Sequence, residues 1–248
     1  MQYSSRFWLY APFLVVLILA AWVIFHWWQA ASAFEKKLAE IKGQPVVPGI
    51  TLDWKAVTVG GFPFRVDANF TNFQIKGEAA YGPFSWSTEK FALHALTYGR
   101  SKTVYEAAGR QSLSWTGAGG AGHAIQFEAG SIHGSSITST NGLMRFDLDL
   151  VNAGNPQYTA RRFQFHLQRD GNNLNLMVRA DDVTGFGKPR KLVQAYASLD
   201  KADVVAPFLR GEIPWTMAMG LWRGLGGKET LSQTVEPELA TEALSPLY

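Results

Sequence analysis

The sequence predicts a mainly β protein, in which an antiparallel meander forms a curved or folded-over sheet after one N-terminal transmembrane helix. Three observations support this prediction. An uncharged apolar segment lies near the N-terminus, about a dozen runs with alternating apolar and polar residues follow it, and the turns between the runs are short. Short connections favour antiparallel neighbours, because parallel strands need long crossovers.

The composition narrows the functional class. The chain has 248 residues, enough for one large or two small domains, and its 47% apolar content excludes a disordered chain. With 23 basic and 20 acidic residues it offers no broad basic surface, so we expect no nucleic-acid partner. The absence of cysteine excludes disulfide scaffolds, thiol nucleophiles and cysteine-ligated zinc.

The first element is a charge-free run from Phe7 to Trp28. As a helix it would be roughly 33 Å long, enough to cross a hydrocarbon core of about 30 Å. We therefore predict a cytoplasmic N-terminus over residues 1–6 and a transmembrane signal anchor over residues 7–29, with the bilayer as its partner. Aromatic residues expected at the two membrane interfaces are Trp8, Tyr10, Trp27 and Trp28.

Two other interpretations of this run fit less well. A buried core helix is rarely this long without a charge, and the apolar region of a cleaved signal peptide is only about 7–15 residues long. The positive-inside rule alone favours the opposite orientation, because three lysines follow the run, but long domains are translocated largely regardless of charge. We expect a single-pass membrane protein with most of the chain on one side of the bilayer.

A juxtamembrane helix and linker are expected over residues 30–48. Phe34, Leu38 and Ile41 are spaced as on one helix face, and Pro45 and Pro48 end the helix. The β-rich domain is predicted over residues 49–229.

Within this domain the apolar spacing changes to two, which is typical of strands with one buried face. In the clearest run Phe62, Phe64, Val66, Ala68 and Phe70 share that face. The other clear runs cover 144–150, 163–167 and 174–178, and weaker runs cover 51–59, 72–78, 84–97, 102–108, 110–116, 123–129, 131–140 and 190–200.

Turn signals and the C-terminal segment complete the prediction. Asp170-Gly171-Asn172 joins two clear runs, so residues 160–180 should form a hairpin. Residues 214–225 carry Trp215, Met219 and Trp222 at helical spacing and should form a short amphipathic helix on the sheet. Residues 230–248 are polar and are expected to form a disordered tail.

Several motifs in this order resemble the bacterial domain of unknown function 2125 family. The residues that carry the resemblance are Trp54, Gly61-Phe62-Pro63-Phe64-Arg65, Gly82-Pro83-Phe84 with Trp86, and Trp222-Arg223. The resemblance covers roughly residues 5–230 and implies a single-pass protein of the bacterial inner membrane, with most of the chain in the periplasm as a β-rich domain. It implies further strands after the last motif, where this chain shows no clear alternation, so an uncovered edge or apolar surface is expected there.

We interpret these motif residues as structural elements more than as a site. Phe62 and Phe64 should be buried on one face of a strand, and Pro63 suits an edge strand or a strand start because it lacks an N–H. Arg65 should point to the opposite face and pair with Asp53 or Asp67.

No catalytic, cofactor or metal site is predicted, because the five histidines lack ligand spacing and no serine lies in a nucleophile elbow. The first hypothesis is a non-enzymatic envelope protein whose aromatic-rich sheet face binds a lipid or another apolar ligand. The alternatives are a scaffold or assembly factor that binds an envelope protein partner and, least favoured, a periplasmic hydrolase. The deciding observation is the shape of the sheet, because inward alternation looks the same in a filled barrel and in an open trough.

Overall fold

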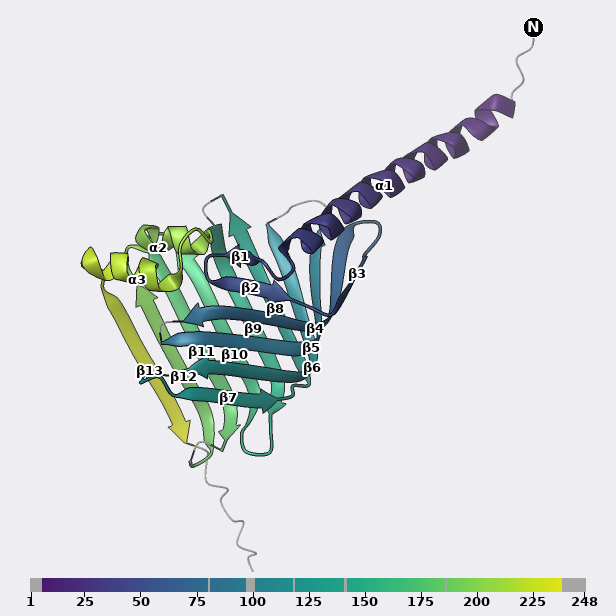
Figure 1. Ribbon diagram of the computed structural model, residues 1–248. Coiled ribbons are helices and arrows are strands. Elements are labelled where there is room, and N and C mark those ends of the chain that lie inside the picture. Colours follow the sequence, from purple (N-terminus) through teal and green to yellow (C-terminus); the bar gives the residue numbers. More distant parts are fainter. Residues whose placement is uncertain are drawn as a thin grey trace, which may run out of the picture.

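A long N-terminal helix leads into a large curved antiparallel sheet, to which two short helices are added near its last strand (Figure 1). Figure 1 shows a computed structural model that describes residues 6–79, 81–96, 101–117, 119–140, 142–185 and 187–237. The helices are α1 (Arg6–Ile41), α2 (Ala202–Leu209) and α3 (Trp215–Gly224). The strands are β1 (Pro45–Val47), β2 (Ile50–Asp53), β3 (Ala56–Gly60), β4 (Arg65–Ala79), β5 (Gly82–Leu96), β6 (Lys102–Thr116), β7 (Gly122–Phe127), β8 (Ser131–Ser139), β9 (Gly142–Gly154), β10 (Thr159–Asp170), β11 (Asn173–Thr184), β12 (Arg190–Leu199) and β13 (Glu229–Pro237).

The described strands form one thirteen-stranded sheet, which confirms the predicted fold class. Its order is β1-β2-β4-β5-β6-β8-β9-β10-β11-β12-β13, with β3 added to β4 and β7 added to β6. Every ladder is antiparallel, and the predicted hairpin is β10 with β11. The sheet does not close in the described part of the chain: β13 pairs with β12 on one side only.

Helix α1 is continuous, so the predicted anchor and juxtamembrane helix are one element. The side chains of its apolar part are exposed, which argues against a buried core helix. Within the described residues it is the one helix long and apolar enough to cross a membrane. Its last turns leave this exposed region, because Leu38 is buried against Trp54 at the start of the sheet.

One face of the sheet is apolar across almost its full width. Directly paired residues form a row that crosses ten strands, and every member is apolar. The row runs Val57, Phe70, Phe91, Ala107, Ile132, Leu150, Phe163, Ala180, Val193 and Val235. Because side chains alternate between faces, the neighbouring row on the other side is mainly polar and includes Glu106, His133, Asp149 and Arg179.

The sheet bends sharply along a line through Asn72, Glu89 and Gly109. Asn72 and Gly109 have positive φ angles, and the β5–β6 register shifts next to Glu89, as expected for β-bulges. At this line β4 changes its partner from β3 to β2, and β6 changes its partner from β8 to β7. The second half of β4, the first half of β5 and the second half of β6, with β1, β2 and β7, form a short layer in front of the long layer, β8–β13 (Figure 1).

Two buried polar side chains hold this bend. Gln111 is fully buried, and its Nε2 donates to Thr88 Oγ1 at 2.8 Å and to the Gly109 carbonyl at 3.0 Å. The Thr88 hydroxyl lies 3.1 and 3.3 Å from the carbonyls of Lys90 and Ala108. These bonds satisfy carbonyl groups that the interrupted ladder leaves without regular partners.

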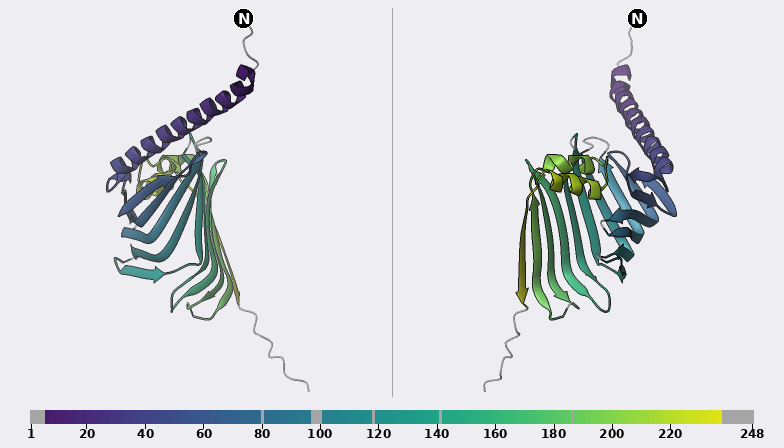
Figure 2. Two further views of the ribbon diagram at one scale, coloured as in Figure 1. Left: turned by 90° about the vertical axis from the view of Figure 1, so that its right-hand side faces the viewer. Right: turned by 60° about the vertical axis from the view of Figure 1, so that its left-hand side comes forward.

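Three packing clusters cover most of the apolar face. The C-terminal turns of α1 cover β3 and β4 around Trp54, Phe70 and Phe73. The short layer packs Trp86 against a second cluster that contains Ile132 and Leu150. Helices α2 and α3 cover Leu174 and Leu199 at one end of the long layer (Figure 2).

Three sequence predictions need correction. Residues 62–64 are a turn with a cis Phe62–Pro63 bond, and Phe62 and Phe64 are exposed and not buried in a strand. Strand β4 begins only at Arg65, because Gly61 at φ 96° and Pro63 lie between two antiparallel strands that need a turn. The tail predicted to be disordered contains β13, which is paired with β12 over most of its length; the rest, residues 238–248, lies outside the described residues.

The other differences concern boundaries and helix α2. The weak runs 72–78 and 110–116 continue their preceding strands through the bulges, and the run 51–59 is divided into β2 and β3. The helix predicted over residues 214–225 is confirmed as α3 and is packed as expected, with Trp222 buried on Leu174 and Leu199. Helix α2 was not predicted, because its eight residues contain Pro207 and include too few polar residues to show an amphipathic pattern.

The buried bonds at the bend lead to a stability prediction. Gln111→Met retains the volume of the side chain but leaves the Thr88 hydroxyl and the Gly109 carbonyl without this donor. We expect a loss of about 1 kcal/mol, at the low end of the cost of unsatisfied buried polar groups, because the substitution also removes the Gln111 Oε1, which is buried without a hydrogen-bond partner. Chemical denaturation of the full chain in detergent measures it. Gln126→Met, on the exposed polar face of β7, is the control; equal stability of both variants would contradict this role of Gln111.

Candidate functional site

An open apolar groove lies on the long layer next to α2 and α3. Four adjacent strands, β10 to β13, form it, and its volume is about 460 Å³. Its lining residues are Phe165, Leu176, Val178, Ala195, Tyr196, Ala197, Leu231, Ser232 and Gln233. Leu176 also packs against the cluster beneath the two helices, so the helices border the groove at one end.

The groove is hollow for two reasons that the sequence explains. Strand β12 contributes Ala195 and Ala197, which lie opposite Val178 and Leu176. Their small side chains leave a depression in the surface of the sheet. Strand β13 is the last described strand, so the side chain of Leu231 is 69% exposed at the rim. A concave apolar surface with a few polar groups at its margin is typical of sites for small apolar ligands.

A chain of aromatic rings connects the groove with the end of α1. Successive ring centroids lie between 5.1 and 6.4 Å apart, within the range of favourable aromatic contacts. The rings belong to Trp54, Phe70, Phe91, Tyr105, Phe146 and Phe165. The apolar surface beneath α1 and the floor of the groove are therefore parts of one continuous face.

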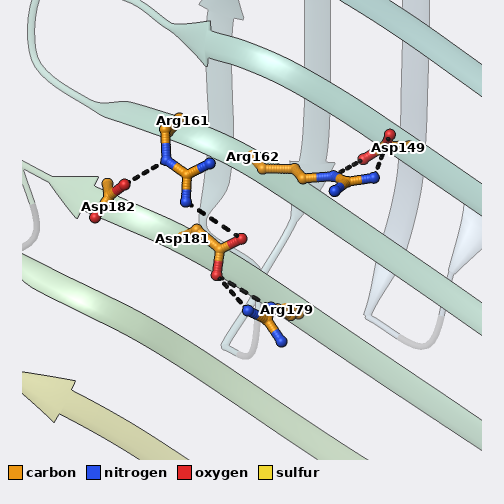
Figure 3. A network of polar contacts seen from close by, with 6 residues as sticks. All are labelled: Asp149, Arg161, Arg162, Arg179, Asp181 and Asp182. Carbon is orange, nitrogen blue, oxygen red and sulfur yellow. Dashed lines mark hydrogen bonds and ion pairs between the residues drawn. The ribbon is translucent and has the colours of Figure 1, made fainter.

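The opposite face of the long layer is polar, and several of its charges are paired. Arg162 donates two hydrogen bonds to Asp149, of 2.8 and 3.0 Å, across β9 and β10. Asp181 is mostly buried between two arginines. Figure 3 shows the network of Asp149, Arg161, Arg162, Arg179, Asp181 and Asp182. Because these arginines are paired with carboxylates, this surface favours solvent over a large anionic partner.

A second polar cluster on this face combines Asp147, Arg145 and His166. Arg145 Nε donates to Asp147 at 2.7 Å, and His166 Nδ1 lies 2.6 Å from the other carboxylate oxygen. Burial by itself raises the pKa of Asp147, but the hydrogen bonds and positive charges of Arg145 and His166 outweigh it and lower the pKa below its ordinary value. Ser135 lies 3.5 Å from the same carboxylate and not next to the imidazole, so the three side chains do not form a nucleophilic triad.

One protein-family model matches most of this chain. The model of the family described as an uncharacterized protein conserved in bacteria, DUF2125, matches residues 27–241. The chain belongs to the DUF2125 family. The match begins at Trp27, so most of the exposed apolar helix precedes it, whereas the sheet, the groove and both short helices lie within it. Comparison with curated proteins gave no match, and comparison with solved structures gave none.

The motif residues of this DUF2125 chain lie in three separate places. The first is the aromatic cluster beneath α1, where Phe73 packs between Trp54 and Trp86. Gly82 and Pro83 begin β5, and the ring of Phe84 lies over Gly77, where a Cβ would be only 2.6 Å away. These residues have structural roles: Gly82 and Pro83 begin a strand, Trp54 and Trp86 pack in the core, and Phe84 packs over Gly77.

The second place is the C-terminal end of α3. Trp222 is buried, and its indole nitrogen donates to the Asp200 carbonyl at 2.7 Å. Its ring lies so close to Gly227 that a Cβ there would be 2.2 Å away. Arg223 follows on the exposed side of α3.

The third place is the turn over residues 61–64 beside α1. Trp27 contacts the ring of Phe62, and Arg65 pairs with Asp67 at 2.9 Å, which confirms one of its two predicted partners. Among the other aromatic residues expected at membrane interfaces, Tyr10 and Trp28 are exposed on α1, and the side chain of Trp8 lies outside the described residues.

Sequence reasoning identified only part of the groove. Phe165 and Val178 lay in clear runs, but Ala195 and Ala197 lay in a weak one, and Leu231 was assigned to a disordered tail. The available signal was the alternation of Val193, Ala195, Ala197 and Leu199, whose small residues indicate space above the strand. Within the described residues, no group of three or more histidines and carboxylates could hold a metal ion.

The lowered pKa of Asp147 predicts a pH-dependent contribution to stability. Since the folded pKa lies below the ordinary value of 3.8, this contribution is complete above that value and is lost as the pH falls through the folded pKa. Asp147→Asn should therefore lower the melting temperature at neutral pH, and its difference from the wild type should shrink in acid. Asp170→Asn, at the exposed end of β10, is the control. A difference independent of pH would contradict the prediction.

Proposed function

We propose that this chain is a non-enzymatic, single-pass protein of the bacterial inner membrane whose periplasmic domain holds the apolar chain of a lipid in the groove. The groove is the single observation that carries this proposal. It is open, apolar and continuous with the face on which α1 packs. The exposed apolar length of α1 supports a signal anchor or signal sequence, and we favour the anchor.

The chemistry of the groove fits an acyl chain better than a polar ligand. Its floor is made of aliphatic and aromatic side chains, and the polar residues Ser232 and Gln233 come from the edge strand. Each methylene removed from water contributes about 0.8 kcal/mol without needing a hydrogen-bond partner. An open groove of this kind also lets a headgroup remain in water while the chain is covered.

Ala195 offers a test of lipid binding. It lies exposed on the floor of the groove, so Ala195→Glu adds a charge and Ala195→Trp adds bulk without disturbing a buried core. We expect both variants to retain several-fold less co-purified lipid than the wild type, measured by mass spectrometry after extraction in mild detergent. The charge opposes an apolar chain, and the indole occupies its space.

The control for this test is Gln194→Glu. This residue precedes Ala195 on β12 and points to the opposite, polar face, so the same charge is added to the same strand outside the groove. The control should retain lipid at the wild-type level. Wild-type protein that carries no lipid, or an equal loss in all three variants, would refute the groove as the binding site.

A scaffold or assembly function is the second candidate, supported by α3. Met217, Leu221 and Leu225 are spaced along one side of this helix, are exposed and do not face the sheet. A photo-crosslinking residue at Leu221 should then give one dominant protein adduct in native membranes, whereas the same residue at exposed Thr216 should give none. Adducts with lipid alone, or no adduct at Leu221, would reject this candidate.

A further inference from the structure

The turn over residues 61–64 exposes two large aromatic side chains beside α1. Phe62 is 52% exposed and Phe64 is 64% exposed, in a domain whose other phenylalanines are mainly at least half-buried. The turn joins β3 to β4 at the end of the sheet from which α1 extends (Figure 2). Exposed aromatic residues at one end of a molecule mark a surface for an apolar partner.

Trp27 fixes the position of this turn along α1. Its ring contacts that of Phe62 with centroids 5.5 Å apart, and its Nε1 donates to the Arg65 carbonyl at 3.0 Å. Trp27 is also the penultimate residue of the charge-free apolar run. The two phenylalanines therefore lie beside the last turn of the apolar span and not beside the charged part of the helix.

The turn is also held from the side of the sheet. Arg65 Nε lies 2.9 Å from Asp67, and Asp67 lies 2.7 Å from His94 on the next strand. Gly61 adopts φ 96°, and a Cβ there would be 2.8 Å from the Arg65 carbonyl. The backbone of the turn is thus fixed on both sides, while both phenylalanines remain more than half exposed.

We propose that Phe62 and Phe64 insert into the interfacial layer of the bilayer that holds α1, so that this turn is a second contact between the domain and the membrane. The inference rests on the membrane anchoring proposed above. Aromatic rings favour the headgroup level of a bilayer, where Trp27 would lie as the belt residue of the span. Nearby, Leu96 is exposed directly opposite Arg65, which extends the apolar surface, and the Arg65 guanidinium is exposed toward lipid headgroups.

A single helix permits rotation of the domain about its axis, whereas two contacts fix which side of the sheet faces the bilayer. The turn and Trp54 lie at opposite ends of β3, and α1 contacts both, through Trp27 at the turn and Leu38 at Trp54, so this edge of the apolar face lies against the anchor helix. This arrangement would hold the aromatic chain that leads to the groove in a constant position relative to the lipid.

The lack of cysteine makes a direct test simple, because a single introduced thiol can be labelled without background. The full chain carrying Phe64→Cys is labelled with an environment-sensitive fluorophore and reconstituted into vesicles of phosphatidylethanolamine and phosphatidylglycerol. We expect a quencher attached near the lipid headgroup to reduce its emission several-fold more than aqueous iodide does. Phe62→Cys is the second position and should behave in the same way.

Tyr81→Cys is the matched control. Tyr81 is also an aromatic residue that is 64% exposed in a turn between two strands, but it lies at the opposite end of β4. Its label should be quenched by iodide and not by the lipid-borne quencher. Equal lipid quenching at Phe64 and Tyr81, or iodide quenching alone at Phe62 and Phe64, would overturn the inference.

Flotation of the same vesicles separates this inference from the proposed anchoring. If the protein does not float with the vesicles or is released by alkaline carbonate, the anchor itself is refuted, and the inference falls with it. If the protein floats and resists carbonate but the labels at Phe62 and Phe64 remain in water, only the second contact is refuted.

Discussion

The physical constraint on which this structure depends is a sheet with one almost entirely apolar face. The row from Val57 to Val235 crosses ten strands without a polar member, and such a surface must be removed from water. A closed barrel would cover it with itself. This sheet stays open, and three elements each cover a part of its apolar face. They are the C-terminal turns of α1, the short layer of the sheet, and helices α2 and α3. The groove lies in a part of this face that these coverings leave exposed.

The short layer lies over the long layer because the sheet bends, and buried polar groups stabilise this bend. A continuous ladder would keep the second half of β4, the first half of β5 and the second half of β6 in line with β8, and Trp86 could not reach the cluster around Ile132 and Leu150. The bulges at Asn72 and Gly109 interrupt the ladder, and buried Thr88 and Gln111 satisfy the carbonyls there. A polar side chain in the core is thus what permits the apolar faces to meet.

The sequence predicts the antiparallel sheet because alternation is a local signal that each strand carries separately. It also places breaks at residues 71 and 109, next to the two bulges, although it does not distinguish a bend from a turn. Strand β13 was not predicted because its sequence has little apolar alternation. Its main apolar residues are Leu231 and Val235, which are exposed because β13 is an edge strand on an open groove. Phe62 and Phe64 were wrongly assigned to the core because alternation of apolar residues does not distinguish a buried strand face from exposed apolar residues in a turn.

Exposed apolar side chains occur on α1, on the turn beside Trp27 and in the groove. The aromatic chain from Trp54 to Phe165 joins the C-terminal end of α1 to the groove. On the polar face of the long layer, Arg162 and Arg179 are paired with Asp149 and Asp181, so these arginines offer little unpaired positive charge to an anionic partner. Selectivity in this chain would come from the width and polarity of the groove, which small residues on β12 and an uncovered edge at β13 determine.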